Sequence, residues 1–303
     1  NESRLKLKCE NLKLPPQMTI ITDERCTTYH SPGHPERPFR VAGTVKQLKA
    51  QMKIKVDWAK PEAAPLEKVL RAHTKNHYQR LGEPHDFDGD TAYHEGIREH
   101  ALRGAGGALK ALELAKAGKP HFSLLRPPGH HATKERAMGF CYLGSVAIAA
   151  LEAKAAGAKR VAVFDFDVHH GNGTEDILAK RDDLAFFSIH QHPAYPGTGT
   201  KSFDNCHNYT VRPGLPREDY RKTAEKAVAD LKAFKPDVVI ASAGFDAYEG
   251  DPLCNQKLSA DDFRWYGKTL AGLGVPLANA MEGGYSDDLP DLVTAYLEGL
   301  LGK

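Results

Sequence analysis

The sequence has few cysteines, and their spacing excludes a disulfide framework. Five cysteines are scattered over 303 residues, and no two of them form a Cys-x-x-Cys pair. Secreted domains that depend on disulfides carry more cysteines at closer spacing. We therefore expect free thiols in a reducing compartment and predict a cytoplasmic location.

The sequence also lacks a long apolar run and an excess of charge of either sign. No apolar stretch approaches the about 18 residues that a membrane-spanning helix needs, and residues 1–4 do not resemble the start of a signal peptide. The 41 Lys and Arg residues are balanced by 39 Asp and Glu residues, which argues against the basic surface of a nucleic-acid-binding protein. We therefore predict neither a membrane nor a nucleic acid as a partner.

Apolar segments of strand length alternate with amphipathic segments of helix length along most of the chain. The predicted strands are 18–22, 121–125, 161–166, 184–189, 237–243 and 276–280. The predicted helices are 35–51, 94–117, 144–156, 218–234, 260–272 and 289–300. This alternation is typical of a parallel sheet with helices on both faces. We predict one α/β domain over residues 18–303, preceded by a Lys-rich peripheral extension over residues 1–17.

The segment 161–173 carries the most informative motif. It begins as an apolar strand and then places Asp165, Asp167 and His169 on alternate positions. Side chains two residues apart on a strand share a face, so we expect these three to point the same way. Two carboxylates and an imidazole on an apolar strand are costly unless they are paired. A divalent cation removes that cost, and these ligand types suit zinc or a similar first-row ion.

Asp246 follows another predicted strand and completes a set of three ligands with Asp167 and His169. Three protein ligands leave a coordination position for water and substrate. Taken alone, Asp246 after Gly244-Phe245 is equally consistent with a helix N-cap. Together with the other two residues, Asp246 is better explained as a metal ligand.

Further polar residues follow other predicted strands. His130 and His131 lie after Arg126-Pro-Pro-Gly, His190 ends a strand, and Tyr285 follows Glu-Gly-Gly. A His-His pair is more often part of a surface turn, and a Gly-Gly-Tyr turn is common. However, the carboxyl ends of parallel strands meet at one edge of a sheet. Five strands therefore deliver reactive side chains to the same edge.

The charges of the predicted ligands indicate a mechanism. A dication with two carboxylates and one neutral imidazole has no net charge. Three-His zinc lowers the pKa of bound water to about 7, and two anionic ligands should weaken this effect. A separate general base is then required, and histidine suits that role. The site predicts metal-assisted hydrolysis of a carbonyl compound.

Taken together, these residues resemble the zinc-dependent histone deacetylase family, which has the arginase–deacetylase fold. The motifs that carry the resemblance follow the family's order at residues 34–40, 126–131, 139–141, 165–173, 195–199, 246–253 and 282–285. The resemblance implies that Asp167, His169 and Asp246 hold one Zn²⁺ per chain. It implies that His131 acts as general base and then as general acid, with His130 as its electrostatic partner. Asp165 would orient His130, and the Tyr285 phenol would polarise the acyl oxygen.

The resemblance also implies substrate and potassium sites. Asp90 would grip backbone amides of the substrate, and an acyl-lysine channel would be lined by Gly139, Phe140, Tyr195 and Leu253. A structural or modulatory K⁺ would be bound by the Ser188 hydroxyl and by backbone oxygens of Asp165, Asp167, His169 and Ile189. A cation so close to the histidine pair would lower its pKa.

Three residues depart from the patterns within the family. Asn172 stands behind the second histidine where class I members carry Asp, which makes the chain similar to the class II branch and favours a neutral base. Tyr195 replaces a more usual Phe and leaves the acyl-chain preference open. Leu253 stands where the polyamine-specific branch has an acidic residue, which favours acyl-lysine over acetylpolyamine.

The predicted function is therefore hydrolysis of an acyl group, acetyl above all, from the side-chain nitrogen of lysine in a protein or peptide. One alternative is a deacetylase of acetylpolyamines or other small acylated amines. A second is a binuclear manganese enzyme of the arginase type, although that needs more Asp and His ligands. A third is a non-catalytic acyl-lysine binder. The oligomeric state, the physiological substrate and the acyl length stay open.

Overall fold

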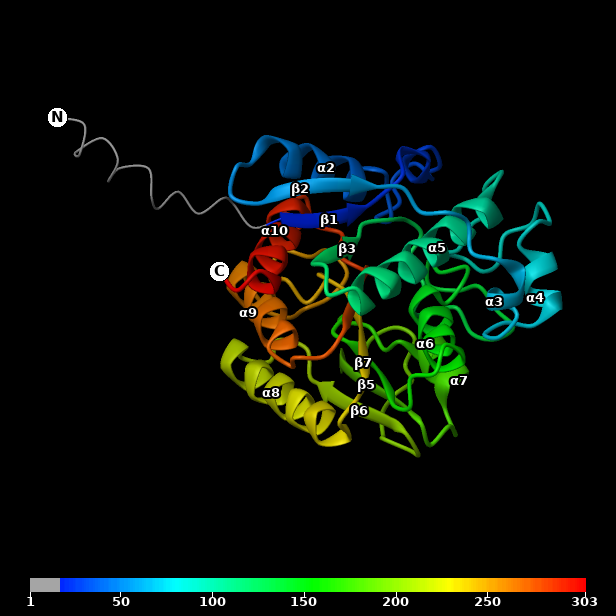
Figure 1. Ribbon diagram of the computed structural model, residues 1–303. Helices are drawn as coiled ribbons and strands as arrows, with labels where there is room; N and C mark the ends of the chain where they lie inside the picture. Colours follow the sequence, from blue (N-terminus) through cyan, green and yellow to red (C-terminus); the bar gives the residue numbers. More distant parts are fainter. Residues whose placement is uncertain (1–16) are drawn as a thin grey trace.

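A central sheet of eight parallel strands organises the computed structural model, which describes residues 17–303 (Figure 1). The strand order is β2-β1-β3-β8-β7-β4-β5-β6. The strands are β1 Gln17–Ile21, β2 Lys55–Ala59, β3 His121–Ser123, β4 Val161–Asp165, β5 Leu184–Gln191, β6 Cys206–Val211, β7 Val238–Ala243 and β8 Leu277–Met281. All pairs are parallel, and β4 lies in register with β5 and β7 through Asp165, which is opposite Ser188 and Ser242.

Helices cover both faces of this sheet. Figure 1 shows α2, α8, α9 and α10 on one side and α5 and α6 on the other. The helices are η1 Glu24–Thr27, α2 Phe39–Ala50, α3 Leu66–Val69, α4 Lys75–Arg80, α5 Ile97–Lys116, α6 Ser145–Ala155, α7 Asn172–Leu178, α8 Arg217–Phe234, α9 Ala260–Ala271 and α10 Leu289–Leu300. Within residues 17–303, no helix is long and apolar enough to cross a membrane.

The local sequence explains these elements. The central strands β4, β5 and β7 are buried along their whole length, because helices cover both of their faces. Helix α9 instead buries one stripe, formed by Phe263, Tyr266 and Leu270, as expected for a helix on the surface of a core. It begins with a capping box between Ser259 and Asp262, which satisfies backbone N–H groups of the first turn.

All six predicted strands are present, but the sheet has two more. The additional strands, β2 and β6, are the two edges of the sheet. Both carry polar residues and are only partly buried, since an edge strand needs no continuous apolar run. The helices α2 and α5 also begin later than predicted, at Phe39 and Ile97.

Two boundaries differ from the predictions. Strand β4 ends at Asp165, so the prediction that Asp165, Asp167 and His169 share one face of a strand is wrong. The chain bends after Asp165, where its Oδ1 accepts the Asp167 N–H at 3.1 Å. Gln17, assigned to the predicted extension, is the first residue of β1, and the rest of that extension lies outside the described residues.

A buried histidine links the loops beside the site, and we expect it to make stability depend on pH. His73 Nδ1 donates to the Thr133 carbonyl at 2.9 Å, and its Nε2 accepts the Gly144 N–H at 2.9 Å. Burial lowers the pKa of His73 to about 3. The folded pKa lies below the unfolded value of about 6.5, so this contribution to stability is complete above pH 6.5 and is lost as the pH falls towards 3.

Replacing His73 with asparagine should therefore flatten the acid limb of the stability curve. Between pH about 6 and 4, the slope of unfolding free energy against pH should fall by about 1.4 kcal/mol per pH unit relative to the wild type. Urea unfolding of both proteins across this range measures the difference. Equal slopes would show that the His73 ring is not held neutral by the fold.

Candidate active site

Residues that follow four neighbouring strands meet at the carboxyl edge of the sheet. The loop after β3 carries the paired histidines, β4 leads to Asp167 and His169, β7 leads to Asp246, and β8 leads to Tyr285. These strands are adjacent in the order β3-β8-β7-β4. Segments that are far apart in sequence are therefore brought to one place, as expected for an open parallel sheet.

Asp167, His169 and Asp246 form a buried cluster with the chemistry of a metal site. One ligand atom from each lies within 4.8 Å of the other two. His169 Nδ1 is 3.2 Å from Asp167 Oδ1 and 3.0 Å from Asp246 Oδ2. Burial and the neighbouring Asp167 carboxylate raise the pKa of Asp246 to about 7, so a bound dication would relieve the repulsion between the two acids. The donor set fits zinc.

The backbone around this cluster leaves room for the two carboxylates and donates hydrogen bonds to them. A Cβ atom on Gly283 would lie 2.3 Å from Asp246 Oδ2 and 2.4 Å from Asp167 Oδ2, so only glycine fits between the two acids. The Gly283 N–H donates to Asp167 Oδ2 at 2.7 Å, and the Val168 N–H donates to Asp246 Oδ1 at 2.8 Å. These bonds leave the remaining oxygens of the two carboxylates facing His169.

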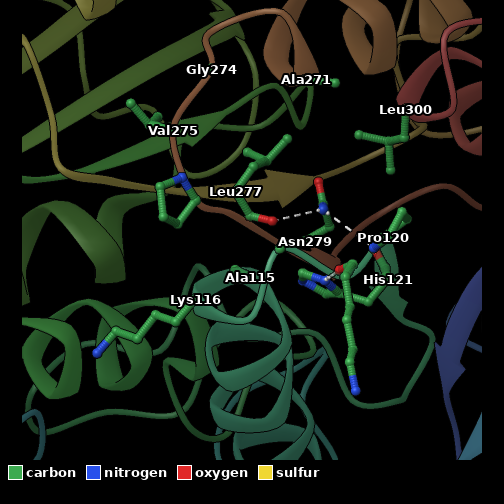
Figure 2. A pocket seen from close by; sticks show the side chains of 13 residues that line it. Ala115, Lys116, Pro120, His121, Ala271, Gly274, Val275, Leu277, Asn279 and Leu300 are labelled. Atoms are coloured by element: carbon green, nitrogen blue, oxygen red, sulfur yellow. Dashed lines mark hydrogen bonds between the residues drawn. The ribbon is translucent and has the colours of Figure 1, made fainter.

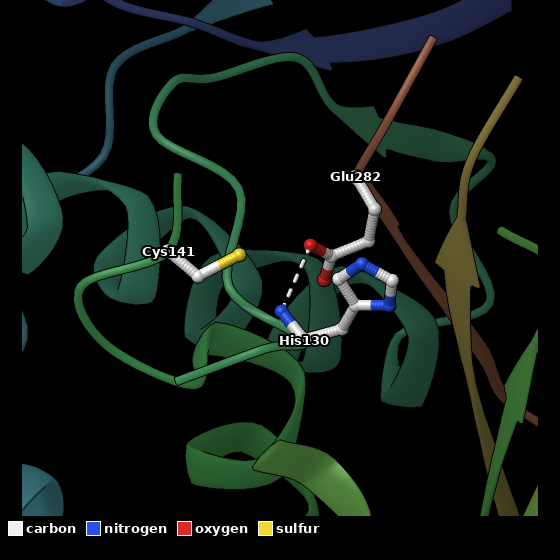
Figure 3. A group of neighbouring side chains, drawn as sticks. All are labelled: His130, Cys141 and Glu282. Atoms are coloured by element: carbon white, nitrogen blue, oxygen red, sulfur yellow. Dashed lines mark hydrogen bonds between the residues drawn. The ribbon is translucent and has the colours of Figure 1, made fainter. Parts of the chain in front are cut away.

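A second group of possible ligands, His130, Cys141 and Glu282, lies next to this cluster (Figure 3). The Glu282 carboxylate already accepts N–H groups from Gly129 at 2.6 Å and His130 at 3.1 Å, and the Ser242 hydroxyl at 3.1 Å. Glu282 therefore fixes the loop that carries the two histidines. A soft thiol and one occupied carboxylate also do not suit manganese, which weakens the binuclear alternative.

His130 and His131 lie side by side with different neighbours. Their ring centroids are 4.0 Å apart. His130 Nδ1 is 3.1 Å from Asp165 Oδ2, whereas His131 Nδ1 is 2.7 Å from Asn172 Oδ1. Burial opposes a charge on His130, but the Asp167 and Asp165 carboxylates raise its pKa to about 10. Burial, with His130 and His169 nearby, lowers the pKa of His131 well below its usual range.

Tyr285 packs against a buried network of charges that the sequence did not reveal. The Arg40 guanidinium lies 4.8 Å from the centroid of the Tyr285 ring and donates to the Gly284 carbonyl at 2.7 Å. Arg40 also pairs with Glu36, which in turn pairs with Arg126. Burial raises the pKa of Tyr285 well above its usual range, so the phenol keeps its proton.

A cavity of about 190 Å³ opens onto this machinery and is lined by Asp90, His131, Gly139, Phe140, His169, Tyr195, Leu253 and Tyr285. All five residues that are predicted to bind the substrate line this cavity. The rings of Phe140 and Tyr285 meet edge to face with centroids 5.7 Å apart, and Tyr195 meets His131 in the same way at 5.1 Å. The cavity is thus lined by aromatic rings, with the buried polar groups of His131, His169 and Tyr285 among them.

Larger hollows exist, but they lack this chemistry. One of about 400 Å³ lies at the opposite end of the strands, where Figure 2 shows His121 and Asn279 among apolar side chains and Lys116. Its only imidazole, within the described part of the chain, is His121, whose Nδ1 donates to the Lys119 carbonyl at 2.7 Å. Chemistry rather than size therefore identifies the site.

His190 does not take part in the site as the sequence suggested. Its Nε2 is 3.0 Å from the Gly199 carbonyl, and its Nδ1 is 2.9 Å from the Ser188 hydroxyl. The ring thus supports the loop that carries Tyr195 instead of reaching the cavity. Ser188 and Ile189, the predicted potassium ligands from β5, are both fully buried beside β4, and potassium binding there stays a prediction.

Comparison with known proteins places this site in a family. A family profile described as the histone deacetylase domain matches residues 34–300. The chain belongs to the histone deacetylase family. It is 36% identical over 232 residues to the acetylpolyamine amidohydrolase of Mycoplana ramosa, and this alignment covers 70% of this chain and 66% of that relative. It is 34% identical over 292 residues to a probable deacetylase of Archaeoglobus fulgidus, with coverage of 88% and 80%.

Solved structures agree with the family assignment and with the predicted arginase–deacetylase fold. The crystal structure of the HDA15 HD domain superposes with a TM-score of 0.87 at 31% identity, covering 95% of this chain and 89% of that one. An acetylpolyamine aminohydrolase from Burkholderia pseudomallei gives a TM-score of 0.84 at 27% identity, with coverage of 93% and 98%. The predicted fold and the amidohydrolase class of the chain are confirmed.

Proposed function

We propose that this histone deacetylase family member is a zinc-dependent hydrolase that removes an acyl group, acetyl above all, from the Nε atom of lysine in a protein or peptide. The observation that carries the proposal is the cavity itself, which His131, His169 and Tyr285 line together with the aromatic rings of Phe140 and Tyr195. The aromatic rings of Phe140 and Tyr195 suit the methylene chain of a lysine, and the buried polar groups of His131, His169 and Tyr285 suit an amide.

The residues divide the chemistry as follows. Zinc, held by Asp167, His169 and Asp246, would polarise the acyl carbonyl and help to position a water. Asn172 Oδ1 accepts the proton on His131 Nδ1 in a hydrogen bond, which leaves the lone pair of Nε2 for the cavity. His131 then takes a proton from the attacking water and returns it to the leaving amine.

Two further groups stabilise charge in this proposal. The Tyr285 phenol donates to the acyl oxygen as that oxygen gains negative charge. His130 sits beside His131 and is oriented by Asp165, so it supports the base without needing to exchange protons with substrate. The Ser188 hydroxyl and the backbone oxygens near Asp165 would hold a potassium ion, whose charge would lower the pKa of the pair.

A second substrate class, acetylpolyamines, is favoured by one observation. Asp90 lines the cavity, and after burial the Asp88 and Asp90 carboxylates contribute to raising the pKa of the Tyr195 hydroxyl. Acidic groups at the mouth of the cavity would attract the distal ammonium of a small amine. The Mycoplana ramosa relative bears that activity in its name, whereas Leu253 at the mouth offers no charge.

The experiment that separates these functions is turnover by the zinc-loaded protein of an acetyl-lysine peptide and of N-acetylputrescine, each with and without a chelator. We expect cleavage of the peptide and its loss on chelation. Chelator-sensitive cleavage of the polyamine alone would instead support the second class. If the protein cleaves neither substrate and no longer acyl-lysine peptide, the result would favour a protein that binds acyl-lysine without turnover.

A further inference from the structure

The imidazole of the metal-ligand candidate His169 has different neighbours at its two nitrogens. Nδ1 lies among the acids, 3.0 Å from Asp246 Oδ2. Nε2 points the other way and is 3.5 Å from Cys254 Sγ. If Nδ1 binds the metal, Nε2 must carry the ring proton and donate it to the sulfur.

This partner is unusual for a metal-binding histidine. The outer N–H of such a ring generally donates to a carboxylate, a backbone carbonyl or water, whereas a thiol sulfur is a weak acceptor. His169 and Cys254 are each only 8% exposed, and Cys254 is the sole hydrogen-bond partner of His169 Nε2 within residues 17–303. The contact is therefore enclosed and specific.

Cys254 is held in place by the same segment that shapes the site. Asp251 accepts the Leu253 N–H at 3.0 Å and the Tyr285 N–H at 2.7 Å. The Asn255 N–H donates to Gln191 Oε1 at 3.2 Å. Both neighbours of Cys254 are thus fixed, and its sulfur has little freedom to leave the imidazole.

We propose that Cys254 is a positioning residue for the metal: its thiol holds His169 in the orientation and tautomer that present Nδ1 to zinc, and it sets the strength of that ligand. This inference rests on the zinc site of the proposed function. A carboxylate at this position would make the imidazole a stronger ligand for the metal and would add a negative charge beside the site. With a neutral sulfur, the metal ligands carry only the two negative charges of the Asp167 and Asp246 carboxylates. These two charges balance the dication, and the metal stays electrophilic.

The test is the zinc affinity of Cys254→Ala, measured on the full chain by competition with a chromophoric chelator. Loss of an outer-shell partner generally costs about 10–100-fold in metal affinity, so we expect the dissociation constant to rise by about tenfold or more. Cys206→Ala is the matched control, because Cys206 is also buried but lies on the edge strand β6. Thermal unfolding of the metal-free variants checks that both remain folded.

A second variant tests the direction of the effect and is informative even if the alanine variant unfolds. Cys254→Asp should bind zinc more tightly than the wild type and turn over an acetylated substrate more slowly. An unchanged affinity in Cys254→Ala, or a weaker affinity in Cys254→Asp, would overturn the role of Cys254 alone. Failure of the wild type to bind zinc would instead overturn the proposed function and this inference together.

Discussion

Replacing His131 with alanine should lower kcat for an acetyl-lysine peptide by about 10²–10⁴-fold, the usual contribution of a general acid–base group. The reason is positional, because His131 lines the cavity and its Nδ1 is engaged by Asn172 at 2.7 Å. Nε2 is then the nitrogen left to exchange protons with water and the leaving amine. Steady-state kinetics and metal analysis of the same preparation measure turnover and zinc content together.

The metal content distinguishes a base from a ligand. We expect the alanine variant to retain one zinc per chain, and its loss would place His131 in the coordination shell. His207→Ala is a suitable control, since its ring is stacked on Phe187 with centroids 4.6 Å apart on the edge strand β6. That variant should keep both turnover and zinc.

Replacing Asp246 with asparagine should raise the dissociation constant for zinc by about 100-fold or more. Loss of an outer-shell partner already costs about 10–100-fold, and here an anionic ligand itself would become a neutral amide. Asp246 is fully buried, and its Oδ2 lies 3.0 Å from His169 Nδ1, so the substitution acts directly on the ligand cluster. Chelator competition provides the measurement.

The other end of the same strand provides the control for Asp246. Asp237 precedes β7 and accepts the N–H groups of Lys159 and Arg160 at 2.8 and 2.9 Å, far along the strand from the cluster. Asp237→Asn should therefore leave zinc affinity unchanged. Equal affinities in wild type and Asp246→Asn would move the third ligand elsewhere.

The sequence predicts the parts of this fold in which local pattern and burial agree. Strands such as β4 and β7 are apolar along most of their length, so their interior position is visible in the residues themselves. The edge strands β2 and β6 are not, because their outward sides tolerate Lys55, Asp57 and Asn208. Only pairing with β1 and β5 makes them strands, and pairing is a property of the tertiary structure.

The same distinction applies to the site. Residue types and spacing are sufficient to propose Asp167, His169 and Asp246, and the structure brings these three together. The supporting contacts cross large sequence distances, as between Arg40 and the Gly284 carbonyl or His169 and Cys254. No local pattern marks such pairs, so Cys254 carried no signal apart from its proximity to Asp251-Pro-Leu253.

The position of β8 in the sheet has a consequence for how the molecule is made. Strand β8, the last of the described strands in chain order, is inserted between β3 and β7, and within residues 17–303 it alone joins the β2-β1-β3 half to the β7-β4-β5-β6 half. Until it is synthesised, both halves expose an unpaired inner edge, a state prone to misassociation. Gly283 and Tyr285 follow soon after β8, so a nascent chain would complete its sheet and its candidate active site in the same step.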